Sequence, residues 1–346
     1  MKEALVTKGP EVQVVDSPVP SPNDDQVLIR VVVSGSNPKD WKMAEWFRKA
    51  PSNEGDDIAG VVERVGANVF EFKPGDRVAA FHEMATPHGS YAEYAVAWAH
   101  TTFHIPHETT FEEAAALPLA AMTAAVGLYA RLGLPQPLAP RPDDAPPLPL
   151  IIYGASSAVG IYAVQLARRS NIHPLICVAG RARDYVSGFL DKARGDVVVD
   201  YRDGDDAVVA GILLAAGDKK LMYALDAVSE GSSPANLARV LDAGGGAQAT
   251  FVLYGRQDLP AHIVQNVTTV GSVHKDLKDF GHVYYRYFAR GLQEGWFKGQ
   301  RTQVMPGGLG GIEAALKDLK AGNASAVKYV FRIAETEGVV GSREGE

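Results

Sequence analysis

Residues 150–169, with the sequence LIIYGASSAVGIYAVQLARR, constrain the fold of this chain more than any other stretch. A short apolar run leads into a loop of small residues, and an amphipathic segment with helical spacing follows. A strand, a tight turn and a helix in this order offer backbone N–H groups and a helix N-terminus to a pyrophosphate. The loop departs from the order GxGxxG, so a turn without a ligand remains the alternative. We predict a dinucleotide site at Ser156, Ser157, Ala158, Val159 and Gly160.

The next apolar run, residues 175–178, is predicted to be the neighbouring parallel strand. A domain that binds NAD carries Asp or Glu at the end of this strand, where the carboxylate accepts a hydrogen bond from the ribose 2′-OH. Here Gly180, Arg181 and Arg183 follow, and no carboxylate appears before Asp184. Guanidinium groups match phosphate oxygens, so we predict NADPH as the cofactor. Two solvated surface arginines are the alternative.

Length and composition limit the classes of protein that this chain can belong to. A chain of 346 residues exceeds one ordinary core, so two domains are expected. The net charge of −7 argues against a nucleic-acid partner, which would require a basic face. The single cysteine, Cys177, excludes an intramolecular disulfide and fits a reducing compartment. No signal peptide or membrane span is recognisable, so we expect a cytoplasmic protein without a membrane partner.

The pattern along the chain changes twice. Residues 1–117 contain short strands separated by turn residues, which favours a small barrel or sandwich. Residues 112–131 are expected to be helical with a break at Pro118, and the proline-rich residues 135–149 should form an exposed loop, for which partner docking is conceivable. Beyond this loop, strands alternate with helices, as in a parallel sheet. Further elements are predicted at residues 249–254 (strand), 279–297 (helix), 312–319 (helix) and 327–333 (strand).

Several phrases together resemble the medium-chain dehydrogenase/reductase superfamily, in its zinc-free quinone oxidoreductase and fungal-type enoyl reductase branch. They are Asn37-Pro38-Lys39-Asp40-Trp41-Lys42, residues 55–66 (GDDIAGVVERVG), residues 75–78 (GDRV), residues 89–94 (GSYAEY), residues 117–124 (LPLAAMTA) and residues 154–160 (GASSAVG). The resemblance implies an α/β protein with a GroES-like β-barrel domain over residues 1–118. A Rossmann domain, a doubly wound parallel sheet that binds NADPH, would cover residues 119–275. Residues 276–346 would return to the first domain, and the cleft between domains would hold the nicotinamide.

Zinc-dependent members of this superfamily carry Cys and His ligands in the first domain. Here no cysteine precedes Cys177, and Gly55-Asp56-Asp57 stands where those members read Gly-His-Glu. Since the spacing of the histidines matches no helical metal pair, we predict no metal. Without a Lewis acid, a simple carbonyl lacks its electrophile. A conjugated acceptor needs less help, because its charge delocalises into an enolate or hydroquinone that hydrogen bonds stabilise.

Four residues are candidates for the chemistry. Asn37 would face the nicotinamide or the substrate, as the resemblance implies, and a turn residue is its alternative. Lys42 is the candidate proton donor, although a solvated lysine is equally plausible. Asp40 would either orient Lys42 or cap the next turn. Thr123 would bond on the nicotinamide side, or back to its own helix.

Other residues are assigned to the cofactor. The resemblance places Tyr201 near the adenosine 2′-phosphate, and Lys328, together with Ser325, near the cofactor. Tyr254 and Gly255 are expected to end a strand at the carboxyl edge of the sheet, where ligands bind in open α/β folds.

We therefore expect an NADPH-dependent oxidoreductase that passes hydride to an electron-poor C=C bond or a quinone without a metal. One alternative is an enoyl reductase that acts in trans, with a carrier domain of a polyketide synthase as its partner. Another is a non-catalytic NADPH-binding sensor of the same fold. The protein would be a monomer, or a homodimer that pairs through a Rossmann edge strand at residues 268–273.

Overall fold

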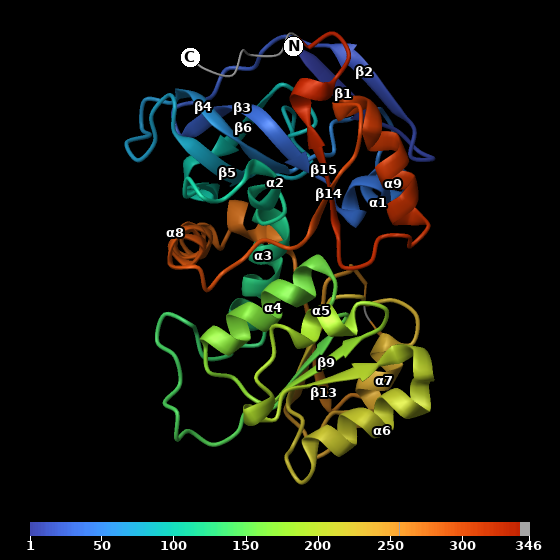
Figure 1. The fold of residues 1–346 in the computed structure, drawn as a ribbon. Coiled ribbons are helices and arrows are strands. Elements are labelled where there is room, and N and C mark those ends of the chain that lie inside the picture. Colours follow the sequence, from blue (N-terminus) through green and yellow to red (C-terminus); the bar gives the residue numbers. More distant parts are fainter. Residues whose placement is uncertain (256, 340–346) are drawn as a thin grey trace. The chain divides into compact units, whose positions relative to one another are not determined.

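The computed structural model describes residues 1–255 and 257–339, and the chain divides into two compact units (Figure 1). Unit 1 consists of Met1–Leu119 and Gly271–Glu346, and unit 2 consists of Ala120–Val270. We describe each unit by itself. No helix in the described part of the chain is long and apolar enough to cross a membrane.

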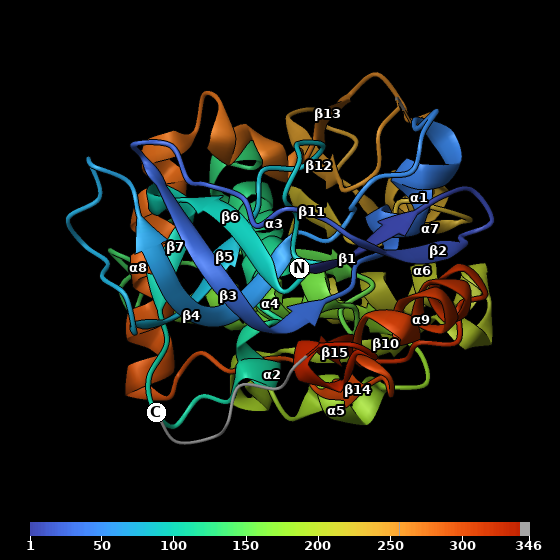
Figure 2. The ribbon, with the colours of Figure 1, turned by 90° about the horizontal axis from the view of Figure 1, so that it is seen from above.

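Unit 1 is built on a seven-stranded sheet with the order β14-β15-β3-β4-β5-β7, in which β6 also pairs with β3 (Figure 2). A separate hairpin is formed by β1 (Lys2–Val6) and β2 (Val12–Asp16). The late strand β15 runs antiparallel to the early strand β3, so the C-terminal segment completes the sheet. The strands of the sheet are β3 (Gln26–Gly35), β4 (Asp57–Val65), β5 (Arg77–Phe81), β6 (Tyr94–Trp98), β7 (Thr102–His104), β14 (Thr302–Val304) and β15 (Lys328–Arg332).

The helices of unit 1 are α1 (Pro38–Trp46), α2 (Phe111–Ala114), α8 (Lys278–Glu294) and α9 (Ile312–Lys320). The helix α3 (Pro118–Ala125) begins at the predicted break and continues as one π-helical stretch, Val126–Arg131. Helix α1 begins with a proline at its first position, where the missing N–H costs nothing. The chain therefore passes from the end of β3 at Gly35 into α1 within two residues, and Asn37 is the residue that precedes the helix.

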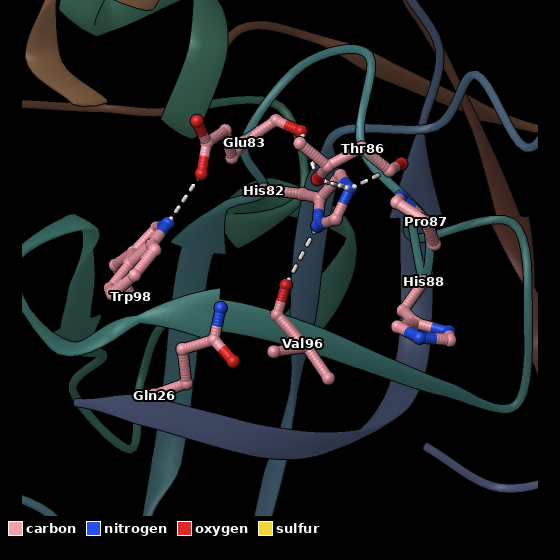
Figure 3. Close-up of a pocket in the computed structure, with 8 residues that line it drawn as sticks. All are labelled: Gln26, His82, Glu83, Thr86, Pro87, His88, Val96 and Trp98. Carbon is pink, nitrogen blue, oxygen red and sulfur yellow. Dashed lines mark hydrogen bonds between the residues drawn. The ribbon is translucent and has the colours of Figure 1, made fainter. Parts of the chain in front are cut away.

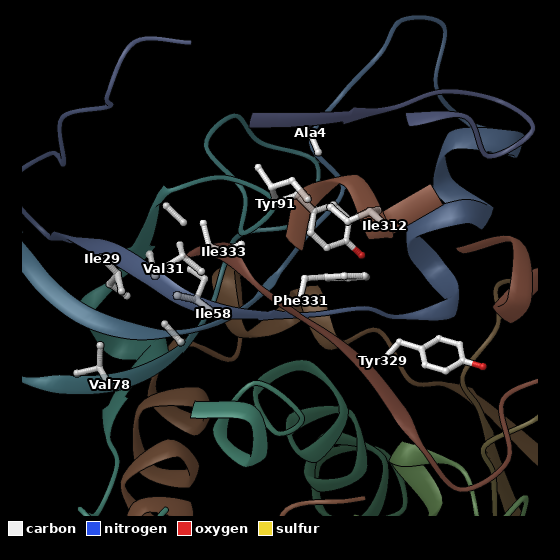
Figure 4. Packing of buried hydrophobic residues seen from close by; sticks show 14 of the residues in the cluster. Ala4, Ile29, Val31, Ile58, Val78, Tyr91, Ile312, Tyr329, Phe331 and Ile333 are labelled. Carbon is white, nitrogen blue, oxygen red and sulfur yellow. The ribbon is translucent and has the colours of Figure 1, made fainter. Parts of the chain in front are cut away.

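The core of unit 1 is a cluster of side chains from β3, β4, β15 and α9 (Figure 4). The rings of Tyr91 and Phe331 meet edge to face at its centre, with centroids 5.6 Å apart. Both side chains are fully buried. Alternate residues of the two strands face this cluster, namely Val27, Ile29 and Val31 of β3 and Ile58 and Val62 of β4, while Leu28 and Ala59 are buried on the opposite face.

Unit 2 contains a six-stranded parallel sheet with the order β10-β9-β8-β11-β12-β13. In the order of the unit's own strands this is 3-2-1-4-5-6, the arrangement of dinucleotide-binding domains. The predicted α/β fold class is thus confirmed. The strands are β8 (Leu150–Tyr153), β9 (Leu175–Ala179), β10 (Val197–Asp200), β11 (Tyr223–Asp226), β12 (Ala247–Phe251) and β13 (Ile263–Val267); the helices are α4 (Ala158–Arg169), α5 (Arg183–Ser187), α6 (Asp205–Ala216) and α7 (Ser233–Val240).

Two sequence predictions for unit 2 are wrong in detail. The strand expected at residues 249–254 ends at Phe251, so Tyr254 and Gly255 lie in the loop after it. Residues 268–273 form no edge strand, because residues 270–274 make a 3₁₀ turn and β13 is the edge of the sheet. An apolar run indicates that a strand is present. Where the strand ends depends on the neighbouring strands with which it pairs, and the local sequence does not show these.

The fully buried Phe331 allows a test of the core of unit 1. Replacing Phe331 with Ala removes a ring that contacts Tyr91, which should cost about 3–5 kcal/mol of unfolding free energy. All four tryptophans (Trp41, Trp46, Trp98, Trp296) lie in unit 1, so their fluorescence in a urea titration reports on this unit. The control is Phe70→Ala, whose ring is 92% exposed and whose loss should matter little. Equal midpoints for the two variants would contradict this account of the core.

Candidate functional site

Strand register brings three distant residues of unit 1 together beside Gly35. Gly35 pairs with Asp57 of β4 on one side and with Val330 of β15 on the other. A Cβ atom at residue 35 would lie 2.2 Å from the carbonyl oxygen of Ala115 and 3.1 Å from Cε of Lys328. Only glycine fits at residue 35, and because it has no side chain, there is room for the side chain of Lys328.

Asn37, Asp57 and Lys328 form a buried hydrogen-bonded network. The ammonium of Lys328 donates to Oδ1 of Asn37 at 2.8 Å and to Oδ2 of Asp57 at 2.6 Å. Nδ2 of Asn37 also donates to Oδ2 of Asp57, at 2.8 Å. The other oxygen of Asp57 accepts from the backbone N–H of Leu119 at 2.7 Å. These bonds fix which end of the Asn37 amide is oxygen and which is nitrogen.

Counting hydrogen bonds leaves one donor hydrogen unused on Asn37 and one on Lys328. Nδ2 of Asn37 has two hydrogens and gives one to Asp57, while the ammonium of Lys328 has three and gives two. Among residues 1–255 and 257–339, no further acceptor takes the remaining hydrogens. Two fixed donors, one of them cationic, are what an oxygen that gains negative charge requires.

A second cluster lies next to this network, around Lys39 and Asp40. The carboxylate of Asp40 accepts from the backbone N–H of Asn37 at 2.7 Å and from the hydroxyl of Tyr91 at 2.6 Å. The ammonium of Lys39 contacts Asp40 at 3.1 Å and also pairs with Asp56. Asp40 therefore caps the start of α1, one of the two roles predicted for it, and holds Asn37 from the backbone side.

Burial shifts the pKa values in this second cluster. Desolvation raises the pKa of Asp40 to about 7 and that of Asp56 to about 6, although the charge of Lys39 opposes both shifts. Burial by itself would lower the pKa of Lys39, but the charges of Asp56, Asp40 and Glu54 outweigh it and raise that pKa. Burial also raises the pKa of Tyr91, whose hydroxyl stays protonated and continues to donate.

The two remaining candidates for the chemistry have different surroundings. Lys42 is buried on α1, and its ammonium lies 5.5 Å from the ring centroid of Trp41 and 5.4 Å from that of Trp46. Such cation–π contacts hold a lysine in place beside apolar groups. Thr123 is buried in α3, on the part of that helix that belongs to unit 2.

The predicted dinucleotide turn of unit 2 has the required geometry. Gly154 has φ +74°, and a Cβ there would lie 2.5 Å from Val228. A Cβ on Gly160 would lie 2.3 Å from the carbonyl oxygen of Gly154, so α4 packs closely against the turn. Ser157 caps α4 by accepting from the N–H of Gly160 at 3.0 Å. This close-packed turn and the N-terminus of a twelve-residue helix fit a bound pyrophosphate.

The ends of β9 and β10 carry the predicted 2′-phosphate residues. A Cβ on Gly180 would lie 2.5 Å from the ring of Tyr201, so this ring covers Gly180. Arg181 and Arg183 follow on the exposed side of the chain. The guanidinium of Arg183 already lies 3.7 Å from Asp184 and 3.8 Å from Asp200. Hydrogen bonds from Arg202 lower the pKa of Asp200 to about 2, so this carboxylate is charged.

A separate pocket of about 230 Å³ lies in unit 1 around His82 (Figure 3). Nδ1 of His82 is 2.7 Å from the carbonyl oxygen of Val96, and Trp98 donates to Glu83 at 2.7 Å. Burial lowers the pKa of His82. Within the described residues, no three or more His, Cys, Asp or Glu side chains are arranged to hold a metal ion.

Reasoning from the sequence missed several partners in this site. The sequence predicts no role for Asp56, Asp57 or Tyr91, which stand only within the family phrases and, for the two aspartates, in place of metal ligands. Lys328 is predicted to lie near the cofactor, and the structure adds its hydrogen bonds to Asn37 and Asp57, which the sequence did not predict. The available signal was a lysine and two carboxylates within apolar strands, since buried charges are rare unless paired.

Comparisons with known proteins agree with this fold. Residues 23–107 match the alcohol dehydrogenase GroES-like domain family. The trans-enoyl reductase fsr4 of Gibberella fujikuroi is 52% identical over 310 residues, which cover 89% of this chain and 91% of the relative. The crystal structure of CurK enoyl reductase superposes with a TM-score of 0.76 at 17% identity, over 95% of this chain and 98% of the other. The quinone oxidoreductase from Coxiella burnetii gives a TM-score of 0.71 at 19% identity, over 96% and 99% of the two chains.

The chain belongs to the medium-chain dehydrogenase/reductase superfamily, in its enoyl reductase branch. Membership supports an oxidoreductase, and members of the superfamily bind a nicotinamide cofactor.

The raised pKa of Asp40 makes the stability of unit 1 depend on pH. The unfolded carboxyl titrates near 3.8 and the folded one at about 7, so the folded state binds more protons between these values. Stability from this group is therefore present at low pH and is lost as the pH rises from 4 to 7. Relative to Asp40→Asn, the native protein should lose stability over this range. Urea titrations followed by tryptophan fluorescence measure the difference at each pH, with the exposed Asp24→Asn as control. A constant difference would be evidence against a protonated Asp40.

Proposed function

We propose that this protein is an enoyl reductase that acts in trans. It would use NADPH to saturate the C=C bond of an α,β-unsaturated thioester, held on a carrier domain of a separate polyketide synthase. The observation that carries this proposal is the buried Asn37–Asp57–Lys328 network with its two spare donors. The 52% identity to a protein named as a trans-enoyl reductase favours this acceptor over others.

The network fits reduction of a conjugated thioester. When bound, NADPH supplies a hydride for the β-carbon, and the electron pair of the C=C bond moves toward the carbonyl oxygen. Asn37 and Lys328 would donate to this oxygen as its negative charge grows. Asp57 holds both donors in place and keeps them from turning away. A proton then reaches the α-carbon from Lys42 or from water, which completes the addition of two hydrogen atoms.

Unit 2 would hold the cofactor. Residues 156–160 and the N-terminus of α4 fit the pyrophosphate, while Arg181, Arg183 and Tyr201 would bind the 2′-phosphate. Tyr254 and Gly255, in the loop after β12, and the hydroxyl of Thr123 complete the proposed set. Lys328 would donate to the same substrate oxygen as Asn37.

The acceptor is tested by following the oxidation of NADPH. The proposal expects reduction of a crotonyl thioester on a carrier domain, and slower reduction of the same acyl group on N-acetylcysteamine. Reduction of quinones but of neither thioester would instead identify a quinone reductase with the same donors. Tight NADPH binding without oxidation by any acceptor would identify a non-catalytic binding protein, and would reject the proposal.

Removing one donor should slow the reaction without loss of the cofactor. Asn37→Ala leaves Lys328 paired with Asp57, so the fold is expected to survive. Loss of one oxyanion donor should lower kcat about 10²–10³-fold. NADPH affinity, measured by fluorescence titration, should stay within about twofold, since Asn37 is not a phosphate ligand. The matched control is Asn323→Ala, at an exposed asparagine of unit 1. Unchanged kcat in Asn37→Ala would refute its assigned role.

The choice of cofactor depends on the two arginines after β9. The double variant Arg181→Ala/Arg183→Ala should raise the KM for NADPH about 10–100-fold, because charge-assisted hydrogen bonds to the phosphate are lost. The KM for NADH should change little. Arg239→Ala, at an exposed arginine of unit 2, is the control. Steady-state kinetics with both cofactors measure the ratio, and an equal loss for NADH and NADPH would argue against a 2′-phosphate contact.

A further inference from the structure

The C-terminal end of α1 presents two neighbouring aromatic side chains to solvent. Trp46 is 53% exposed and Phe47 is 59% exposed, and their rings meet edge to face. Other parts of α1 pack against α9 and against β1. We call Trp46, Phe47, Lys49 and Lys8 the α1 tip. Exposed aromatic pairs of this kind are typical of the centres of protein interfaces.

The α1 tip also carries two exposed lysines, Lys8 and Lys49. Neither ammonium makes a close ion pair with a described residue, although the charge of Lys8 helps to lower the pKa of Glu45, after the hydrogen bonds from Lys320 and the backbone of Gly9. The nearby carboxylates are already engaged, since Glu45 pairs with Lys320 and Glu54 pairs with Arg48. In a chain with a net charge of −7, two exposed lysines near the end of α1 that carries the aromatic pair are complementary to an acidic partner.

A cavity lies near the same end of α1, lined by residues 7–8, 44 and 48–51. Its volume is about 390 Å³, and both lysines line it. Arg48, Ala44 and Ala50 contribute further to the wall, so the cavity joins cationic and apolar groups. It offers space for part of a partner's side chains or for a phosphorylated arm, with cations at its rim.

We propose that the α1 tip is the docking surface for an acidic carrier domain that delivers the acyl thioester. This inference rests on the proposed function and adds to it the surface that recognises the partner. The aromatic pair would contact the apolar part of the carrier surface, and Lys8 and Lys49 would pair with its carboxylates or with the phosphate of its prosthetic arm.

The position of the α1 tip on the helix supports this assignment. Helix α1 starts directly after Asn37 and ends at Trp46. A helix of nine residues is about 13 Å long, so the proposed docking surface and Asn37 lie at opposite ends of one short helix. A flexible pantetheine arm bridges such a distance. A carrier bound at the end of α1 can therefore remain outside while its acyl group reaches Asn37.

The experiment compares one acyl group on two supports. The variant Phe47→Ser/Lys49→Glu removes an aromatic ring and reverses a charge at the α1 tip. Its matched control, Phe70→Ser/Lys73→Glu, makes the same changes at an exposed loop of unit 1. The probes are crotonyl thioester on a polyketide synthase carrier domain and crotonyl-N-acetylcysteamine.

For the α1-tip variant, kcat/KM with the carrier-bound thioester should fall about tenfold or more, because interface aromatics and opposite charges are lost. With the free thioester, the change should stay within about twofold, and the control variant should resemble the native protein on both probes. The loss should shrink as ionic strength rises, since salt screens the native attraction.

The outcomes separate the two proposals. Reduction of the free thioester with no selective loss in the α1-tip variant overturns the docking surface and leaves the enoyl reductase assignment intact. Failure of the native protein to reduce either thioester overturns the proposed function itself. If sedimentation shows that the variant dissociates a dimer of this chain, the α1 tip is a contact between copies, and carrier docking there is rejected.

Discussion

The carboxylate of Asp57 is the interaction on which unit 1 depends. One oxygen accepts from the start of α3 at Leu119, and the other accepts from Asn37 and Lys328. Three segments far apart in the sequence are thus held by one buried charge. Removing a single partner of such a pair leaves an uncompensated charge, which typically costs about 3–5 kcal/mol. The network therefore constrains the fold and the proposed chemistry together.

The adjacent carboxylates of Asp56 and Asp57 form ion pairs with two different lysines. Asp56 pairs with Lys39, and Asp57 pairs with Lys328. Asp56 lies directly before β4 and Asp57 is its first residue, and the two side chains serve two clusters, one capping α1 and one fixing the Asn37 amide. Both clusters meet at Asn37, through its backbone N–H and through its side chain.

The sequence predicts unit 2 well because its signals are local. An apolar run, a small-residue turn and an amphipathic segment define β8, the turn and α4 without reference to distant residues. The ends of β12 and the edge strand β13 depend on pairing, and there the prediction was wrong. In the candidate site, Asn37 was predicted from its motif. Its bonds to Asp57 and Lys328 arise from the register of β4, β3 and β15 at Gly35, which no local pattern encodes.

The same donors would serve a thioester, an enone or a quinone, because each acceptor builds its negative charge on an oxygen. Asn37 and Lys328 therefore discriminate only weakly among these acceptors, because all three present the same kind of oxygen to them. Selection must then come from interactions with the rest of the acceptor. For an acyl chain that arrives on a protein, the largest remaining surface is that of the carrier. Under the proposed function, the protein would gain its specificity through docking, and the cationic, aromatic surface at the far end of α1 would supply it without altering the chemistry at Asn37.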